Sequence, residues 1–243
     1  MTFEDKHTDA AAAQQAADTI LEALELAKRP VIMLGHGVDS SFSQQKLIRF
    51  AQKRQIPIIT SVLAKSVLGY DHPLNFGCIG GAYGHRYANM IANAKSDLLL
   101  CFGISLCTRQ IGTKVHEFAR GAKIIRIDID PYNLQRDIHE NGINEVKLQA
   151  ETGAVIDCLA KAAAPDTEGI SDWLNVCTEI KENLQAVDDA TPERYPNRMI
   201  ADLSDMLEDT SAIAVDVGQH MVWSYQSFKN HEGQKLLFSG GHG

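Results

Sequence analysis

The sequence lacks several features that would assign a protein to a class at once. No apolar run approaches the ~20 residues that cross a bilayer, and the N-terminal segment lacks the apolar core of a signal peptide. Basic residues are outnumbered by acidic ones, 23 to 31, so a basic surface for nucleic acid is not indicated. The five cysteines are odd in number and show neither CxxC nor Cys/His spacing. We therefore expect a protein of the reducing cytoplasm that has no nucleic-acid or membrane partner.

Short motifs that mark common enzyme mechanisms are also missing. The sequence contains no HExxH zinc motif, no GxSxG nucleophile elbow and no GxGxxG dinucleotide fingerprint. No pair of carboxylates or histidines is placed by a motif for acid–base catalysis or for metal binding. We therefore assign no catalytic residue and no metal ligand to this chain. The missing fingerprint also disfavours a nicotinamide-dependent dehydrogenase.

What the sequence does contain is a regular alternation of amphipathic helices and short apolar strands. The expected helices are 10–28, 41–55, 83–94, 113–120 and 153–163, and the expected strands are 30–35, 56–60, 97–103, 122–130 and 145–149. In the helix at 41–55, the apolar residues Phe42 and Leu47 are expected to face the core. Parallel strands need crossovers, which these helices supply. The prediction is an α/β protein with a doubly wound, Rossmann-like parallel sheet of the nucleotide-binding type.

Composition divides the chain into four parts. Residues 1–9 are polar and have no pattern, so we expect a disordered, frayed linker or residues added to the natural chain. Residues 10–164 hold the helix–strand alternation and form the first domain. Residues 165–190 begin with proline, glycine and acids and are expected to be a linker that contains a helix. Residues 191–243 then start a second α/β domain.

The last residues, LLFSGGHG at 236–243, are an apolar strand that leads into a glycine-rich turn. A helix normally follows such a turn and supplies the amides that bind a phosphate, but no helix follows here. We therefore expect the second domain to be truncated and the chain to be part of a larger enzyme.

Candidate ligand-binding residues lie where the predicted strands end. In doubly wound sheets, ligands bind beyond the carboxyl ends of the strands. The segments at these positions are 35–37, 61–66, 103–112 and 128–131. Within them we select as candidate cofactor-binding residues Gly35, His36, Gly37, Gly103, Ser105, Arg109, Asp128 and Asp130.

These candidates have ligand-binding roles and simpler structural ones. Gly35 and Gly37 would turn the chain sharply and expose backbone amides to a diphosphate, or they would serve the turn alone. Arg109 would clamp a phosphate or form a surface salt bridge. Asp128 and Asp130 would accept hydrogen bonds from a ribose or an adenine, although Asp130 is also placed to cap a helix that begins at the following proline.

Four segments together resemble the acetolactate synthase family of thiamine-diphosphate enzymes. They are GHGV at 35–38, YGHRYANMIANAKSDLLLCFG at 83–103, AKIIRIDIDP at 122–131 and VDVGQHMVW at 215–223. That family has three α/β domains: a pyrimidine-binding domain with an activating glutamate, a central domain that holds FAD in many members, and a diphosphate-binding domain. The resemblance implies that residues 10–164 are the central domain and residues 191–243 the opening of the third domain.

The resemblance also implies roles for residues near the end of the chain. Gln219 and His220 match the family's GQH turn, which faces the diphosphate of the cofactor. Gly240, Gly241 and Gly243 match a glycine-rich strand end that leads to the aminopyrimidine. The Mg²⁺ motif and the activating glutamate of the family match no segment here, so the resemblance implies a fragment that is inactive alone.

The resemblance implies a transferase as the complete enzyme. It would decarboxylate pyruvate or another 2-keto acid on thiamine diphosphate and Mg²⁺, and pass the two-carbon unit to a carbonyl acceptor. Members of the family are homodimers or homotetramers.

One stretch departs from the pattern of the synthases. Where they have RFDDRVTG, this chain has SLCTRQIG at 105–112, so only Arg109 and Gly112 are shared. FAD binding and the type of substrate both depend on this stretch. It is similar to synthase-like enzymes of surface-polysaccharide biosynthesis, whose acceptors are keto sugars. A free-standing nucleotide-binding module is an alternative, which the glycine turns and strand-end acids support.

Overall fold

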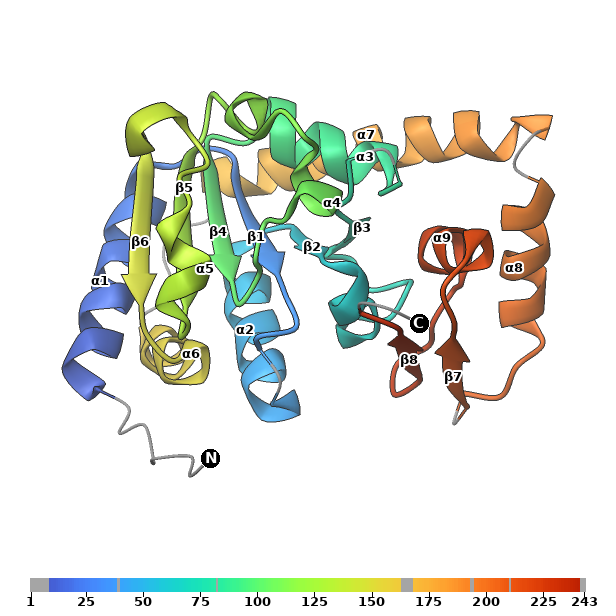
Figure 1. Cartoon of the computed structure of the whole chain (residues 1–243), viewed down its shortest axis with the longest axis horizontal. Helices are drawn as coiled ribbons and strands as arrows, with labels where there is room; N and C mark the ends of the chain where they lie inside the picture. The colour runs from blue at the N-terminus through green and yellow to red at the C-terminus, as the bar shows by residue number, and fades with distance from the viewer. Residues whose placement is uncertain are drawn as a thin grey trace.

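The chain forms a six-stranded parallel sheet with helices on both faces, followed by a smaller βαβ unit (Figure 1). This computed structural model describes residues 9–38, 40–81, 83–162, 168–192, 195–209 and 211–240. The expectations for residues 1–8, for the domain boundary at 164 and for Gly241 and Gly243 lie outside these residues. The predicted doubly wound α/β fold is confirmed.

The six strands run in the order β3-β2-β1-β4-β5-β6, and every pair is parallel. They are β1 (Pro30–Leu34), β2 (Ile58–Thr60), β3 (Asn75–Cys78), β4 (Leu98–Phe102), β5 (Lys123–Asp128) and β6 (Glu145–Gln149). After β1 the chain builds the sheet in one direction through β2 and β3, and it then returns to place β4 on the other side of β1. The order therefore switches between β1 and β4, where Leu34 pairs with Phe102.

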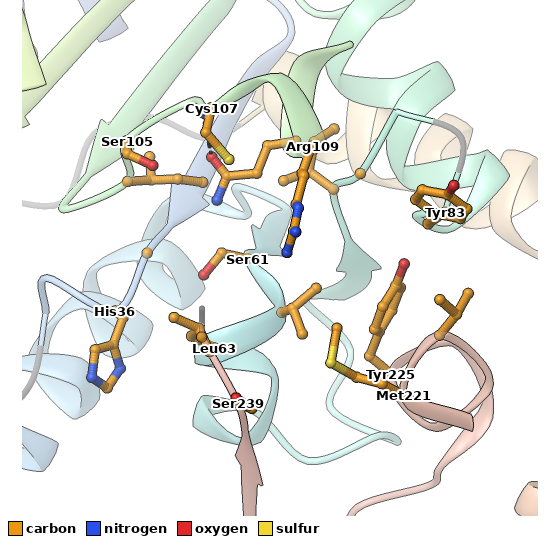
Figure 2. Close-up of a pocket in the computed structure, with 18 of the residues that line it drawn as sticks. His36, Ser61, Leu63, Tyr83, Ser105, Cys107, Arg109, Met221, Tyr225 and Ser239 are labelled. Carbon is orange, nitrogen blue, oxygen red and sulfur yellow. Dashed lines mark hydrogen bonds between the residues drawn. The ribbon is translucent and has the colours of Figure 1, made fainter. Parts of the chain in front are cut away.

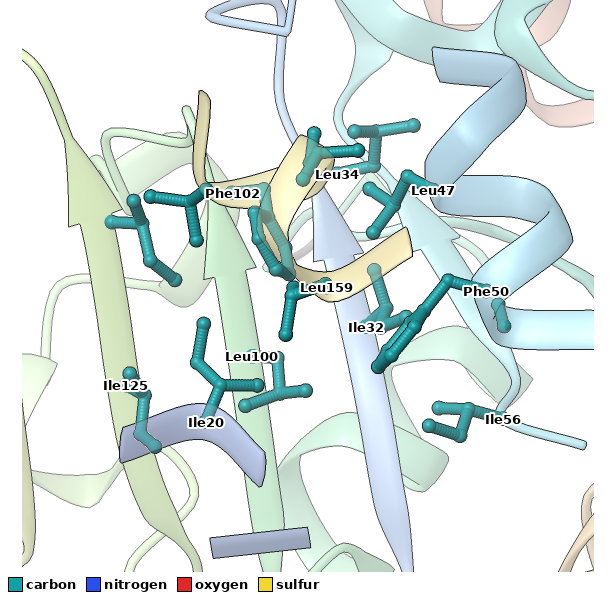
Figure 3. Close-up of a cluster of buried hydrophobic side chains, with 14 of the residues drawn as sticks. Ile20, Ile32, Leu34, Leu47, Phe50, Ile56, Leu100, Phe102, Ile125 and Leu159 are labelled. Carbon is teal, nitrogen blue, oxygen red and sulfur yellow. The ribbon is translucent and has the colours of Figure 1, made fainter. Parts of the chain in front are cut away.

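Three helices cover one face of the sheet: α1 (Ala10–Leu26), α2 (Ser41–Arg54) and α6 (Thr152–Lys161). Figure 3 shows Ile20, Leu47 and Leu159 from these helices above β1, β4 and β5, and all three are fully buried. Burial of one such side chain stabilises the fold by about 1.5–3 kcal/mol. The central strands are apolar on both faces because a second layer of helices covers the opposite side.

That second layer is formed by α3 (Arg86–Asn89), the π-helical segment η2 (Met90–Lys95) and α7 (Glu168–Asp189). Trp173 of α7 is buried, and its indole Nε1 donates to the carbonyl oxygen of Pro30 at 3.0 Å. This bond fixes the start of α7 against the start of β1. The helix belongs to the linker expected at 165–190, yet its first half packs as part of the core.

The last part of the chain is a βαβ unit that follows α8 (Tyr195–Asp205). The strands β7 (Ala212–Val215) and β8 (Lys235–Phe238) pair in parallel, and α9 (Gln219–Ser227) is their crossover. The sequence predicts that residues 191–243 open a second α/β domain; the structure shows the βαβ unit in this region, and the domain assignment stays a prediction. Within the described residues no helix has the length and apolar character needed to span a membrane.

Short elements complete the carboxyl edge and the far side of the sheet. They are η1 (Val62–Val67), α4 (Thr108–Ile111), η3 (Val115–Glu117), α5 (Pro131–Gln135) and η4 (Glu140–Gly142). All five cysteines are free thiols, and Cys78, Cys101 and Cys177 are buried.

Three local expectations were wrong or incomplete. The helix expected at 113–120 is only the short η3, because Gly112 (φ 85°) ends α4 and Ala119 (φ 46°) is left-handed. Strand β3 was missed because its residues, NFGC, lack a run of β-branched side chains. Phe42, expected in the core, is 64% exposed, and the Lys46 ammonium lies over its ring at 3.9 Å.

Three glycines meet at the carboxyl ends of β1 and β4. The amide of Gly37 donates to the carbonyl oxygen of Gly103 at 3.0 Å, and Gly103 has φ 54°. A Cβ on Gly103 would lie 2.6 Å from the Gly37 Cα, and a Cβ on Gly35 would lie 2.6 Å from the Ile104 Cα. Only glycine allows the two chains to approach this closely.

The first prediction concerns this crossing. Gly103→Ala should lower the free energy of unfolding by about 2–4 kcal/mol, since it combines overpacking with a left-handed backbone. Gly112→Ala, at φ 85° and ψ 175° with no atom within 4 Å of the added Cβ, should cost about 1–3 kcal/mol through its backbone conformation without any crowding. Gly121→Ala, which has free space and no positive φ, is the matched control. Chemical denaturation measures all three, and equal losses in Gly103→Ala and Gly121→Ala would refute the crowding.

His85 joins the two units of the chain. Its Nδ1 accepts a hydrogen bond from the Cys78 amide at 2.9 Å, and its Nε2 lies 2.8 Å from the Gln226 carbonyl oxygen. Because a carbonyl only accepts, Nε2 carries the proton and the ring is neutral. Burial, followed by the charge of Lys65, lowers the pKa of His85 to about 3. The ring therefore links β3 to α9 in its uncharged form.

The pH dependence of stability follows from this pKa. The unfolded chain protonates His85 below about pH 6.5, whereas the folded chain resists protonation down to about pH 3, so this contribution is lost as the pH falls through that window. Between pH 7 and pH 5 the loss should reach about 2 kcal/mol at most. His85→Asn keeps an acceptor but does not titrate, so denaturation at both pH values should show a smaller loss. A loss identical to that of the unsubstituted chain would contradict the neutral, buried ring.

Candidate functional site

A pocket of about 850 Å³ lies at the carboxyl edge of the sheet, where the strand order switches. The loops that follow β1, β2, β3, β4 and β5 form one side of it, and α9 with the end of β8 forms the other. Figure 2 shows side chains from both units pointing into the same space. The pocket is therefore shared between the α/β domain and the βαβ unit.

The structure brings most of the sequence-predicted residues together here. The pocket is lined by Gly35, His36, Gly37, Gly103, Ser105, Arg109, Asp128 and Gln219. Asp130 lies outside it and caps α5, since its carboxylate accepts from the Tyr132 amide at 2.9 Å. His220 is also outside, exposed on α9 with its ring against Gly218.

The role predicted for the amides of Gly35 and Gly37 was wrong. The Gly35 amide donates to the Phe102 carbonyl oxygen at 2.9 Å, and the Gly37 amide donates to Gly103. These groups are already bonded within the protein, so they cannot also hold a diphosphate. The glycines shape the floor of the pocket through their lack of side chains.

Arg109 is the cation of the pocket. It lies on the short α4, and Figure 2 shows its guanidinium pointing into the pocket between Ser61 and Tyr225. The guanidinium of Arg109 forms no ion pair and no hydrogen bond with any of the described residues. An arginine in this state is suited to bind a phosphate or carboxylate through two parallel hydrogen bonds.

Asp128 is an acid of the pocket whose carboxylate already accepts hydrogen bonds from neighbouring residues. It is 9% exposed, and its carboxylate accepts from the Asp130 amide at 2.9 Å and from the Asn133 Nδ2 at 3.2 Å. A carboxylate has about four acceptor positions, so capacity remains for the hydroxyl groups of a ligand.

Ser61 was not singled out from the sequence, although it begins the segment 61–66. Its side chain is buried, and its Oγ has no hydrogen-bond partner among the described residues. A buried hydroxyl in this state costs about 1–3 kcal/mol. Because Ser61 lines the pocket, a polar atom of a ligand could satisfy it.

The opposite wall is apolar. It is formed by Met221, Val222 and Tyr225 of α9 together with Leu63 and Ile79. Tyr225 is 4% exposed, and burial raises the pKa of its hydroxyl. The sequence analysis named the segments 61–66 and 215–223 but gave no wall role to these side chains, because the α9 residues meet Leu63 and Ile79 across more than a hundred residues of chain.

The donor set of this pocket fits a nucleotide-type ligand, FAD included. Arg109 can hold an anionic diphosphate, Ser61 and Asp128 can bind polar groups, and the α9 wall can cover a flat ring. Nowhere in the described part of the chain do three His, Cys, Asp or Glu side chains gather as a metal site would require. Of the two residues matched to the thiamine-diphosphate turn, only Gln219 faces the pocket.

The comparisons with known proteins agree with this architecture. Residues 17–159 match the family described as "Thiamine pyrophosphate enzyme, central domain". A probable acetolactate synthase large subunit of Methanocaldococcus jannaschii is 31% identical over 238 residues, which are 95% of this chain and 38% of that protein. The acetolactate synthase large subunit of Lactococcus lactis is 26% identical over 98% of this chain and 40% of its own length.

A third relative extends the likeness to another bacterium. The acetolactate synthase isozyme 1 large subunit of Escherichia coli is 29% identical over 90% of this chain and 37% of its own length. The chain thus spans at most two fifths of the length of these relatives. With the matching central domain, the parallel sheet and the pocket at its switch point, the chain belongs to the acetolactate synthase-like family of thiamine pyrophosphate enzymes.

Proposed function

We propose that this chain is the nucleotide-holding part of a larger thiamine-diphosphate enzyme. That enzyme would decarboxylate a 2-keto acid such as pyruvate and transfer the two-carbon unit to a carbonyl acceptor. The family supports this reaction class, and the relatives named acetolactate synthase support the substrates. The observation that carries the role of this chain is the pocket in which, among the described residues, the Ser61 hydroxyl and the Arg109 guanidinium have no hydrogen-bond partner.

The proposed ligand of the pocket is FAD or its ADP portion. The diphosphate would pair with Arg109, while the Ser61 hydroxyl and the Asp128 carboxylate would bind polar groups of the ligand. Met221 and Tyr225 would cover an aromatic ring. Ser105 and Cys107 line the pocket from the loop after β4, and both are neutral where the synthase pattern has charged residues. A flavin would therefore be held chiefly by Arg109. The same difference supports a keto-sugar acceptor as the second candidate for the complete enzyme.

Thiamine diphosphate, when bound, would supply the nucleophile and the electron sink that decarboxylation of a 2-keto acid requires. This chain would contribute Gln219 and His220 near its diphosphate. The ligands for Mg²⁺ and the activating acid would come from other segments, because the described residues hold no such cluster. We propose that the complete enzyme is a cytoplasmic homodimer or homotetramer and that this chain is inactive alone.

Inactivity of the isolated chain is directly testable. With pyruvate, thiamine diphosphate and Mg²⁺, the purified chain should release no CO₂ above the rate of a mixture that lacks protein. An acetolactate synthase assayed in parallel controls for the reagents. Turnover by the chain itself would refute the assignment of the chemistry to other segments.

Ligand binding tests the role of the pocket. Isothermal titration of ADP and of FAD should show binding, and Arg109→Gln should weaken it about 10- to 100-fold, the value of a hydrogen-bonded charge. Arg120→Gln is the matched control, since Arg120 is exposed and does not line the pocket. Absence of binding to both ligands would remove the nucleotide role.

Ser61→Ala adds a second readout to the same titration. Without ligand, the variant should be as stable as the unsubstituted chain or more stable, because an unsatisfied hydroxyl is removed. With ligand, it should bind more weakly, because the ligand loses that hydroxyl. Equal affinity would show that the ligand does not reach Ser61.

A further inference from the structure

The loop between β4 and α4 carries Ser105 and leads directly into Arg109 of α4, and Arg136 contacts this loop from the side away from the pocket. Leu106, in the middle of this loop, is fully buried and has φ 49°, a left-handed conformation that costs about 1–2 kcal/mol. A backbone of this kind persists only where its surroundings enforce it. The surroundings of Leu106 are the hydrophobic cluster that buries its side chain and Arg136, just after α5, which binds its carbonyl oxygen.

Arg136 binds the loop through its side chain. Its guanidinium Nη2 donates to the carbonyl oxygen of Leu106 and lies 3.4 Å from that of Ser105. Arg136 is exposed and does not line the pocket. Its side chain therefore acts on the pocket through the backbone of the loop.

The base of Arg136 is anchored by a second arginine. The Arg126 Nη1 donates to the Arg136 carbonyl oxygen at 2.7 Å, and the Arg126 Nη2 donates to the Asn133 carbonyl oxygen. These two bonds hold the middle of α5, at Asn133, and the residue that follows its end, Arg136. Asn133 also donates to Asp128, so the anchored turn touches the acidic side of the pocket as well.

A buried ion pair fixes Arg126. Its guanidinium lies 2.7 Å from the Glu145 carboxylate, and the two side chains are 2% and 0% exposed. The other carboxylate oxygen of Glu145 accepts from the Ile138 amide at 2.8 Å. Buried charges of this kind tolerate little displacement, because each would otherwise lose its partner in a low-dielectric interior. A continuous series of hydrogen bonds thus connects Glu145 of β6, Arg126 of β5 and Arg136 after α5 to the β4–α4 loop.

We propose that Arg136 is a positioning residue for the pocket: by holding the Leu106 carbonyl, it sets the loop so that Ser105 and Arg109 face the bound nucleotide. This inference rests on the proposed nucleotide role of the pocket. Both carbonyl contacts are made by the one nitrogen Nη2, which the planar guanidinium holds one bond farther from the Cα than a lysine ammonium reaches, so the length and planarity of the arginine suit this position.

The experiment distinguishes the hydrogen bonds of the Arg136 side chain to the loop from the effect of its positive charge. Arg136→Lys keeps the charge but not the reach of the planar guanidinium, and Arg136→Gln removes both. Lys123→Gln is the matched control, since Lys123 is exposed at the opposite end of β5 and the described residues show no ion pair for it. Since Arg136 is exposed, these variants are expected to fold, which the unfolding midpoint checks.

Two quantities are measured on each variant. Hydrogen exchange reports the loop, through the amides of Cys107, Gln110 and Ile111, which are all hydrogen bonded within it. Titration with ADP reports the pocket. Both Arg136 variants should speed exchange at these amides and weaken ADP binding about tenfold, the scale for a residue that acts without touching the ligand. The Lys123 variant should change neither.

The outcomes are distinct. Wild-type exchange and affinity in both Arg136 variants would overturn the proposal, and a loss in Arg136→Gln alone would show that the donated hydrogen bond matters and the guanidinium shape does not. Faster exchange with unchanged affinity would overturn it too, since the loop would then be held without positioning the ligand. If the unsubstituted chain binds neither ADP nor FAD, the nucleotide role of the pocket fails, while the exchange rates still decide whether Arg136 holds the loop.

Discussion

The close crossing of Gly35 and Gly37 with Gly103 is the constraint on which the rest of the site depends. Strands β1 and β4 are neighbours at the switch of strand order, and their chains must leave the sheet in different directions within a few ångströms of each other. Without side chains at the crossing, the two loops diverge above the sheet and leave room for a ligand. Side chains there would force the loops apart and displace Arg109.

The pocket is closed from the other side by contacts between neutral groups. His85 links β3 to α9, and the Asn230 side chain donates to the Leu68 carbonyl oxygen at 2.8 Å. Uncharged hydrogen bonds of this kind are less sensitive to salt than ion pairs on the surface. The positive charge of Arg109 is therefore not used to hold the two units together and is available to a ligand in the pocket.

Much of the fold could be read from the periodicity of the chain. Buried parallel strands appear as continuous apolar runs, so β1, β4 and β5 were located closely. Strand β3 and the short α4 could not be located, because NFGC and TRQI derive their structure from neighbours and not from local preference. The same limit applies to Phe42, whose apolar character suggested the core although its position on α2 faces solvent.

The sequence by itself determined the α/β class, the family and the strand ends at which a ligand would bind, because these depend on local pattern and on chain order. The tertiary structure decided which atoms there are available. It showed that the amides of Gly35 and Gly37 are already bonded, that Asp130 caps a helix, and that the Ser61 hydroxyl has no partner within the part of the chain that the structure describes. Availability depends on contacts between residues far apart in the chain, and those contacts exist only once the sheet and α9 have come together.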